Sequence, residues 1–233
     1  VADSSTILIS ADGSPGMMTQ PAPGEEGRAS HRIANDVGTT GMLVSNRAEL
    51  IRALSRLAEP PGPDLPRLAE VLGLGPAPDV SAYTELFVHQ LYPYASFYLG
   101  EAGRLGGDVR EGLAGFWRVL GQEPPEEPDH LTVLLALYAR LIELEAEEAV
   151  AARRAGLDRA CRTCLWEHLL SWLPAYLQKL SEVAPSPYRR WGKLLDETLS
   201  DQARRTPRPS AVPTALETVP PIVDPREADL DSL

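Results

Sequence analysis

The feature that most constrains the fold is a long apolar stripe that begins at Leu131. Apolar side chains recur at spacings of three and four residues, at Leu131, Leu134, Leu135, Tyr138, Leu141 and Ile142. Such a stripe lies along one face of an α-helix and must be covered by other elements. Asp129 or His130 is the expected start of this helix, where a polar side chain can accept from free N–H groups, and Gly156 is its expected end.

Helical periodicity also runs through the rest of the central chain. A second long helix is predicted from Asp158 to Val183, bent or interrupted at Pro174, and one of its faces carries Cys161, Cys164, Leu165, His168, Leu169, Trp172 and Tyr176. Shorter helices are predicted at 47–57, 65–72, 80–92, 108–120 and 188–203. No run alternates with period 2 over more than a few residues. The predicted fold class is therefore all-α, a single bundle of about seven helices.

Composition separates this bundle from two tails. Residues 1–45 and 201–233 are rich in small, polar and proline residues and show no sustained helical or strand period. Neither segment can bury enough apolar surface to offset the entropy of ordering it, so both are predicted to be disordered. Residues 46–200 are the predicted domain, which keeps 22 acids and 16 bases, a net charge of −6.

Charge and hydropathy exclude several classes of protein. The whole chain carries a net charge of −11, which argues against a nucleic-acid partner and favours a cationic one. No window approaches the roughly 18 consecutive apolar residues of a membrane span, and no basic residue precedes the short apolar patch at 7–9 as it would in a secretory signal. With two cysteines in the chain, a reducing compartment is the simpler expectation. The sequence thus favours a cytoplasmic protein without stable membrane insertion.

Cys161, Cys164 and His168 form one candidate chemical site. At helical spacing they share a face, and two thiolates with an imidazole could supply three ligands to zinc. No fourth ligand is apparent, and the alternative is that both thiols are small buried hydrophobes beside a core histidine. A metal- or thiol-dependent enzyme on these residues is the alternative function.

An acidic, proline-rich loop leads into the long helix and forms a second candidate site. It reads Glu123-Pro-Pro-Glu126-Glu127-Pro128-Asp129-His130. Asp129 and His130 could pair at the helix start, where the helix dipole favours a carboxylate. The competing interpretation is an ordinary N-cap with a solvent-facing histidine.

Read together with two other stretches, this loop resembles the TorD/DmsD/NarJ family of cytoplasmic chaperones that mature molybdenum-containing redox enzymes. The first stretch is Tyr92-Pro93-Tyr94-Ala95-Ser96-Phe97-Tyr98-Leu99, followed by a turn at Gly106 and a helix ending in Phe116-Trp117. The second is Glu127 to Leu131, similar to the family's Glu-Pro-x-Asp-His hallmark, although here Pro128 directly precedes Asp129. The third is Trp166 to Pro174, similar to the family's late His-Leu-x-x-Trp helix. The resemblance covers roughly residues 47–200.

The resemblance implies an all-α fold and a function without catalysis or cofactor. The implied function is to bind the signal peptide, often of the twin-arginine type, of a molybdopterin-containing oxidoreductase catalytic subunit, and to hold that subunit until its cofactor is inserted. The residues expected to bind the peptide are Tyr94, Ser96, Phe97, Trp117, Glu127, Pro128, Asp129, His130 and Trp172. Carboxylates would meet the arginines and aromatic rings the apolar part. A monomer and a domain-swapped dimer both stay open, as does a helical scaffold whose tails carry the interactions.

Overall fold

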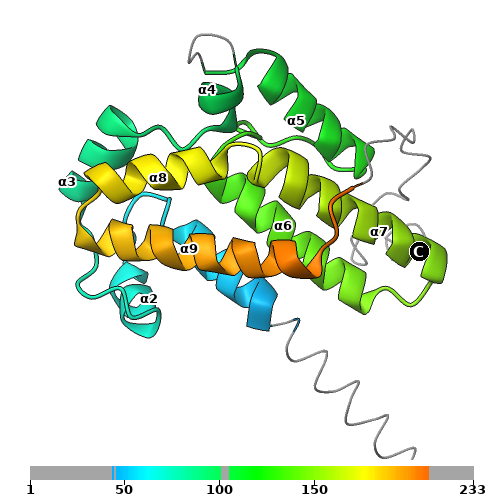
Figure 1. Ribbon diagram of the computed structural model, residues 1–233, viewed down its shortest axis with the longest axis horizontal. Helices are drawn as coiled ribbons and strands as arrows, with labels where there is room; N and C mark the ends of the chain where they lie inside the picture. The colour runs from blue at the N-terminus through cyan, green and yellow to red at the C-terminus, as the bar shows by residue number, and fades with distance from the viewer. Residues whose placement is uncertain (1–43, 45, 101–104, 210–233) are drawn as a thin grey trace, which may run out of the picture. The chain divides into compact units, whose positions relative to one another are not determined.

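The computed structural model describes residues 44, 46–100 and 105–209, and the regular elements among them are helical (Figure 1). The predicted all-α fold is therefore confirmed. The helices are residues 46–56, α2 (Leu65–Val71), α3 (Val80–Tyr83), α4 (Ala95–Leu99), α5 (Gly107–Val119), α6 (Leu131–Glu147), α7 (Ala151–Thr163), α8 (Leu173–Val183) and α9 (Ser186–Arg205). Two π-helical segments, η1 (Thr84–Gln90) and η3 (Cys164–Leu169), continue α3 and α7. Within these described residues the α-helices outnumber the seven that were predicted. One reason is that α4 was not foreseen, and the other is that the predicted helix 158–183 is interrupted before α8.

Helix α6 forms the centre of the hydrophobic core, as its apolar stripe predicted. The side chains of that stripe are almost fully buried, at Leu131, Leu134, Leu135, Tyr138, Leu141 and Ile142. α7 and η3 pack along α6, and α8 packs along α9 (Figure 1). Burying large apolar side chains stabilises the fold by about 1.5–3 kcal/mol each, so the stripe of α6 makes a large contribution to stability.

Helices α8 and α9 form a closely packed antiparallel pair, each begun by a proline at its first turn. A proline at this position costs little because the first N–H groups of a helix have no partner inside it. Gly192 lets the two helices approach, since a Cβ atom there would lie 2.6 Å from Cδ2 of Leu180. On its opposite side α9 holds the first helix, where the Trp191 indole donates to the carbonyl of Leu54 at 3.0 Å.

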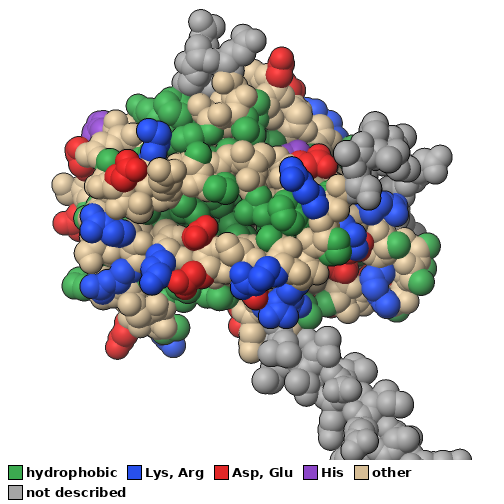
Figure 2. Space-filling model, viewed as in Figure 1, with side chains coloured by type: hydrophobic (Ala, Val, Ile, Leu, Met, Phe, Trp, Pro, Cys, Tyr) green, Lys and Arg blue, Asp and Glu red, His purple; other side chains and the backbone are tan. Residues whose placement is uncertain are grey.

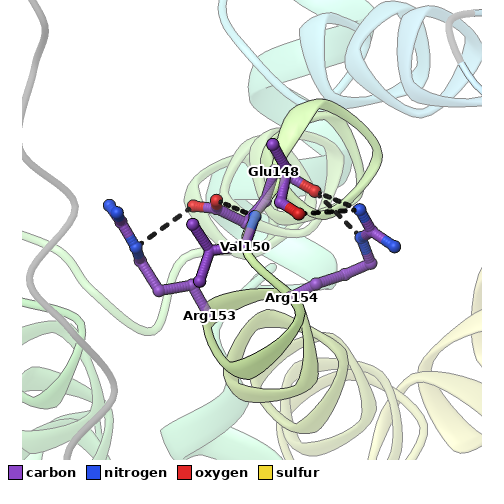
Figure 3. A network of polar contacts seen from close by, with 5 residues as sticks. Glu148, Val150, Arg153 and Arg154 are labelled. Carbon is purple, nitrogen blue, oxygen red and sulfur yellow. Dashed lines mark hydrogen bonds and ion pairs between the residues drawn. The ribbon is translucent and has the colours of Figure 1, made fainter.

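The long helix from Leu131 ends earlier than predicted. It stops at Glu147, and Gly156 lies buried inside the next helix, so the predicted stop at Gly156 is wrong. Figure 3 shows the cause, which is a set of contacts around Glu148. The Glu148 carboxylate accepts from the N–H of Val150 at 2.8 Å, its carbonyl accepts from Arg154 Nε at 2.9 Å, and Arg153 lies 3.8 Å from the carboxylate. The bond to Val150 satisfies the backbone donor of the residue before α7, and the arginine contacts hold the chain where it turns back along α6.

The predicted helix from 158 to 183 is divided into three parts. α7 passes into η3, a turn follows at 170–172, and α8 then begins beside Pro174. The interruption at Pro174 is therefore confirmed, while the uninterrupted stretch before it is not. A similar division affects the predicted helix 80–92, which becomes α3 and η1 and ends at Gln90.

The two predicted tails lie mostly outside the described residues. In the C-terminal one, helix α9 continues to Arg205 and buries Gln202, so the predicted boundary at residue 200 is five residues too early. In the N-terminal one, Val44 is helical and packs against the core. The scaffold hypothesis, which depends on these tails, concerns residues outside the described part.

Candidate functional site

Two segments far apart in the sequence are joined backbone to backbone beside the start of α6. Tyr94 and His130 form an isolated antiparallel bridge. The N–H of Ala95 donates to the carbonyl of Asp129 at 2.9 Å, and the N–H of Leu131 donates to the carbonyl of Pro93 at 2.8 Å. The aromatic stretch and the acidic loop that the sequence singled out are therefore neighbours in the fold.

A buried side-chain bond reinforces this junction. The Ser96 hydroxyl donates to the Asp129 carboxylate at 2.5 Å, and its oxygen accepts from the N–H of Gly106 at 2.9 Å. Gly106 has a φ of +90°, which a residue with a side chain rarely adopts. Ser96 and Asp129 are 0 % and 2 % exposed. That Asp129 itself meets a ligand's arginines stays a prediction; in the structure its carboxylate faces inward and clamps α4 to the acidic loop.

The exposed carboxylates at this junction belong to the loop before Asp129. Glu123, Glu126 and Glu127 are exposed, and none of them forms an ion pair with a described residue. The Tyr94 hydroxyl donates to Glu127 Oε1 at 2.9 Å. Burial, followed by this hydrogen bond, raises the pKa of Tyr94, so the phenol stays a donor. The loop thus presents negative charge to solvent from a rigid base.

His130 caps α6 rather than facing solvent. Its Nδ1 accepts from the N–H of Thr132 at 3.2 Å, and its ring packs edge-on against Tyr94 with centroids 4.8 Å apart. Burial lowers the pKa of His130, partly opposed by Glu127 and Asp129. The neutral ring that results is the form that can accept this hydrogen bond.

The remaining predicted binding residues fall into different environments. Phe97 is half-buried between Tyr92 and Tyr98, with ring centroids 5.3 Å from each. Trp117 is half-buried on α5, and Pro128 is buried beneath the acidic loop. Trp172 is 1 % exposed and stacks on Tyr98. That Trp172 contacts a peptide stays a prediction; in the structure its ring belongs to the core.

An apolar cavity beside the junction escaped the sequence analysis. It has a volume of about 230 Å³ and lies between α4 and α5, lined by Ala95, Leu99, Asp108, Val109, Gly112, Leu113 and His168. Leu99 remains 43 % exposed at its edge. Its adjacency to the acidic loop follows from Ala95, which both lines the cavity and bonds to Asp129. The one available signal was Leu99, which closes the aromatic stretch without belonging to any predicted helix.

The structure gives no support to a metal or thiolate site at Cys161, Cys164 and His168. Both thiols are free and buried, and burial is the main factor that raises the pKa of each. The His168 ring instead packs against Phe116 at 4.7 Å, and burial lowers its pKa to about 4. Among the described residues no group of three or more His, Cys, Asp or Glu has an arrangement that could hold a metal. The interpretation of these three residues as core is favoured.

Comparison with known proteins agrees with the resemblance seen in the three stretches. Residues 63–178 match the model of the nitrate reductase delta subunit family. The chain is 33% identical over 106 residues to the chaperone protein TorD of Vibrio vulnificus, covering 40% of this chain and 46% of that one. It is 30% identical over 145 residues to the chaperone protein TorD of Shewanella amazonensis, covering 52% and 56%. The chain belongs to the TorD/DmsD/NarJ family.

Two further facts place this family member among its relatives. The chain spans about half the length of the curated relatives it matches, and these relatives are named as chaperones rather than enzymes. The matched range 63–178 includes α4, the acidic loop, α6 and η3, so it contains the whole junction. Within the described residues of this TorD-family chain, no helix combines the length and the hydropathy that a membrane span needs.

Proposed function

We propose that this protein is a cytoplasmic maturation chaperone that binds the signal peptide of a molybdopterin-containing oxidoreductase catalytic subunit and holds the subunit until its cofactor is inserted. The observation that carries the proposal is a loop of exposed carboxylates, without ion pairs among the described residues, that bonds through the Asp129 carbonyl to Ala95, a residue that lines an apolar cavity. A signal peptide has the matching order, a basic segment followed by an apolar one. The family's chaperone relatives support the same role.

The basic part of the peptide would bind the acidic loop. Glu126 and Glu127 stand on a base that the Ser96–Asp129 bond and the backbone bridge hold in place. A guanidinium donates through a planar fork and can bind two carboxylate oxygens at once, which a lysine ammonium cannot. A rigid pair of carboxylates therefore favours arginine over lysine in the ligand.

The apolar part of the peptide would enter the cavity between α4 and α5. Leu99, Val109 and Leu113 offer apolar surface there, and Asp108 marks its polar edge. A cavity of about 230 Å³ accommodates one or two large apolar side chains rather than a whole helix. The contribution of this cavity is selective anchoring of the peptide beyond its arginines.

Calorimetry tests this function with the full chain and a synthetic signal peptide of a molybdopterin oxidoreductase encoded near its gene. We expect the double variant Glu126→Gln, Glu127→Gln to weaken binding about tenfold or more, because charge-assisted bonds are lost. Leu99→Asp should weaken it independently. The matched control, Glu147→Gln with Glu182→Gln, alters exposed acids on α6 and α8 and should bind normally.

Two outcomes would contradict the proposal at different levels. If the chain binds neither the peptide nor the apo-subunit, the chaperone function is wrong. If binding is unchanged in both the loop variant and Leu99→Asp, the function stands but the site lies elsewhere. A peptide with its paired arginines changed to lysine should bind the unaltered chain more weakly than the arginine peptide does. The two peptides should bind the loop variant with equal affinity.

A further inference from the structure

A second groove, of opposite charge, lies between α8 and α9. It has a volume of about 540 Å³, with an apolar floor and a basic wall, and is lined by Pro174, Leu177, Gln178, Leu180, Ser181, Arg189, Arg190, Gly192, Lys193 and Asp196. Figure 2 shows hydrophobic side chains in the furrow between the two helices, with Lys and Arg side chains beside them. The close approach at Gly192 gives the furrow its floor, because α9 has no side chain there to fill it.

Neither arginine on this wall forms an ion pair with a carboxylate of the described residues. Arg189 donates to the carbonyl of Ala184 at 3.0 Å and Arg190 to the carbonyl of Leu74 at 3.1 Å, so both bond to neutral oxygens. Lys193 contacts Glu197 at 3.8 Å in a side-chain pair that is 77 % and 60 % exposed. Such an exposed pair contributes little and exchanges readily for another carboxylate. Three cations on one wall outweigh the one acid, Asp196.

The sequence after Pro209 has the complementary composition. Residues 216–233 hold five acids and one base, interspersed with the apolar residues Leu216, Val219, Ile222, Val223, Leu230 and Leu233. Outside the α6 and α7 region, no other stretch of similar length has as many acids, as few bases and as many leucine, isoleucine and valine residues. An acidic, apolar segment matches a basic, leucine-floored groove in both respects.

The described residues before this segment are held against η3. The indole of Trp166 donates to the carbonyl of Thr206 at 3.0 Å, and the Arg208 guanidinium lies 5.6 Å above the same ring. Trp166 belongs to η3, which leads into Pro174 at one end of the groove. The 24 residues after Pro209 can span up to about 80 Å, far more than the ~18 Å that separates Arg205 from Lys193 along α9.

We propose that residues 216–233 of this same chain bind in the groove between α8 and α9, with their carboxylates on Arg189, Arg190 and Lys193 and their apolar side chains on Leu177 and Leu180. The covalent connection gives the segment a millimolar effective concentration at the groove. The groove is thus an internal binding surface, distinct in sign from the acidic loop that the proposed function uses.

Carbodiimide cross-linking of the full chain tests this directly, because Lys179 and Lys193 are its only lysines. The reagent joins an amine to a carboxylate in contact with it, and mass spectrometry identifies the joined residues. We expect Lys193 to be joined to acids within 216–233 in the monomer. The neighbouring Lys193–Glu197 pair serves as an internal positive control.

Lys179 is the matched comparison, since it is exposed on α8 but does not line the groove. The Lys193→Arg variant keeps the charge and removes the reactive amine, so its Lys193 cross-links should vanish without a gain at Lys179. The yield should fall severalfold as salt rises from 0.05 to 0.5 M. Equal joining of the segment to Lys179 and Lys193, joining found only in dimers, or no joining beside a normal Glu197 product would each overturn the proposal. Signal-peptide binding by the Lys193→Arg variant should be normal, so failure here is distinct from failure of the proposed function.

Discussion

At the scale of single residues, the aspartate next to the capping histidine acts through its burial. Asp129 is the one charged side chain that is buried among the described residues, and its carboxylate accepts a hydrogen bond from the Ser96 hydroxyl, 33 residues away in the sequence. From the sequence alone Asp129 could be identified as important but not as buried, because its hydrogen-bond donor comes from an element that periodicity did not detect. In the proposed function the exposed Glu127, two residues before it, takes the role expected of Asp129.

The Ser96→Ala variant should lose about 2–3 kcal/mol of unfolding free energy. The substitution leaves a buried carboxylate without its hydroxyl donor and the N–H of Gly106 without an acceptor, and an unsatisfied buried group costs about 1–3 kcal/mol. Urea denaturation measures the loss. Ser181→Ala, an exposed serine that bonds only to the carbonyl of Gln178, should change stability by less than about 0.5 kcal/mol. Equal effects of the two variants would show that the Ser96–Asp129 bond is not a clamp.

The half-buried His168 should make the protein less stable as the pH falls below about 6.5. Burial lowers its pKa from 6.5 to about 4, so the unfolded chain takes up a proton in this range while the folded chain does not. The contribution of His168 to the free energy of unfolding is therefore fully present above pH 6.5, and up to about 3 kcal/mol of it is lost as the pH falls toward 4. Denaturation at a series of pH values should show a shallower slope for His168→Gln, with the rest due to groups such as His130, whose pKa is also lowered. His89→Gln, at an exposed position on η1, should keep the full slope.

At the scale of elements, periodicity predicted where helices lie better than where they end. The helices at 46–56, α2, α5 and α9 lie within a few residues of their predicted positions, and a proline lies in the first turn of α2, α8 and α9. The α6 end was mispredicted because a glutamate side chain, not a glycine, produces it. The π segments were invisible because one extra residue per turn hardly shifts an apolar stripe over six or seven residues.

The Glu148→Ala variant should loosen the start of α7 while leaving α6 intact. The change removes the acceptor for the Val150 N–H and the ion pair with Arg153, a loss of about 1 kcal/mol for a capping side chain. Hydrogen exchange measured by mass spectrometry should become faster at 150–154 and stay unchanged at 134–142. Glu147→Ala, at the exposed last residue of α6, provides the comparison. Unchanged exchange at Val150 in Glu148→Ala would show that the Arg154 bonds to the Glu148 carbonyl suffice.

At the scale of the whole molecule, the fold class followed from the sequence while the site depended on its tertiary assembly. The apolar stripe on α6 had to be covered by other helices, and in the structure α7 and η3 pack along α6. Two hollows form where helices meet, the cavity between α4 and α5 and the groove between α8 and α9. Neither could be predicted from the sequence of a single segment. The acidic loop could be recognised because its charge and prolines are local features of the chain.

The two cysteines should report global unfolding rather than local chemistry. Cys161 and Cys164 are 4 % and 0 % exposed, and burial raises the pKa of both thiols above the ordinary value, which slows reaction with disulfide reagents. Labelling of the native protein should therefore be at least about a hundredfold slower than that of a free thiol. In urea, the labelling rate should rise over the same concentration range in which tryptophan fluorescence reports unfolding. Cys161→Ser and Cys164→Ser single variants assign each thiol. Rapid labelling of either thiol in the native protein would restore the thiol-dependent alternative.

The backbone bridge between Tyr94 and His130 has a consequence for how this family can diversify. It closes the chain between them, with α5, into a loop tied at its base. Once a loop is tied, doubling its length costs only about 0.6 kcal/mol of closure entropy. Residues inserted beside the exposed Gly121 should therefore be tolerated without breaking the bridge at the base of the loop. The length of the segment from 95 to 129 can in this way change while the bridge that ties its two ends is kept.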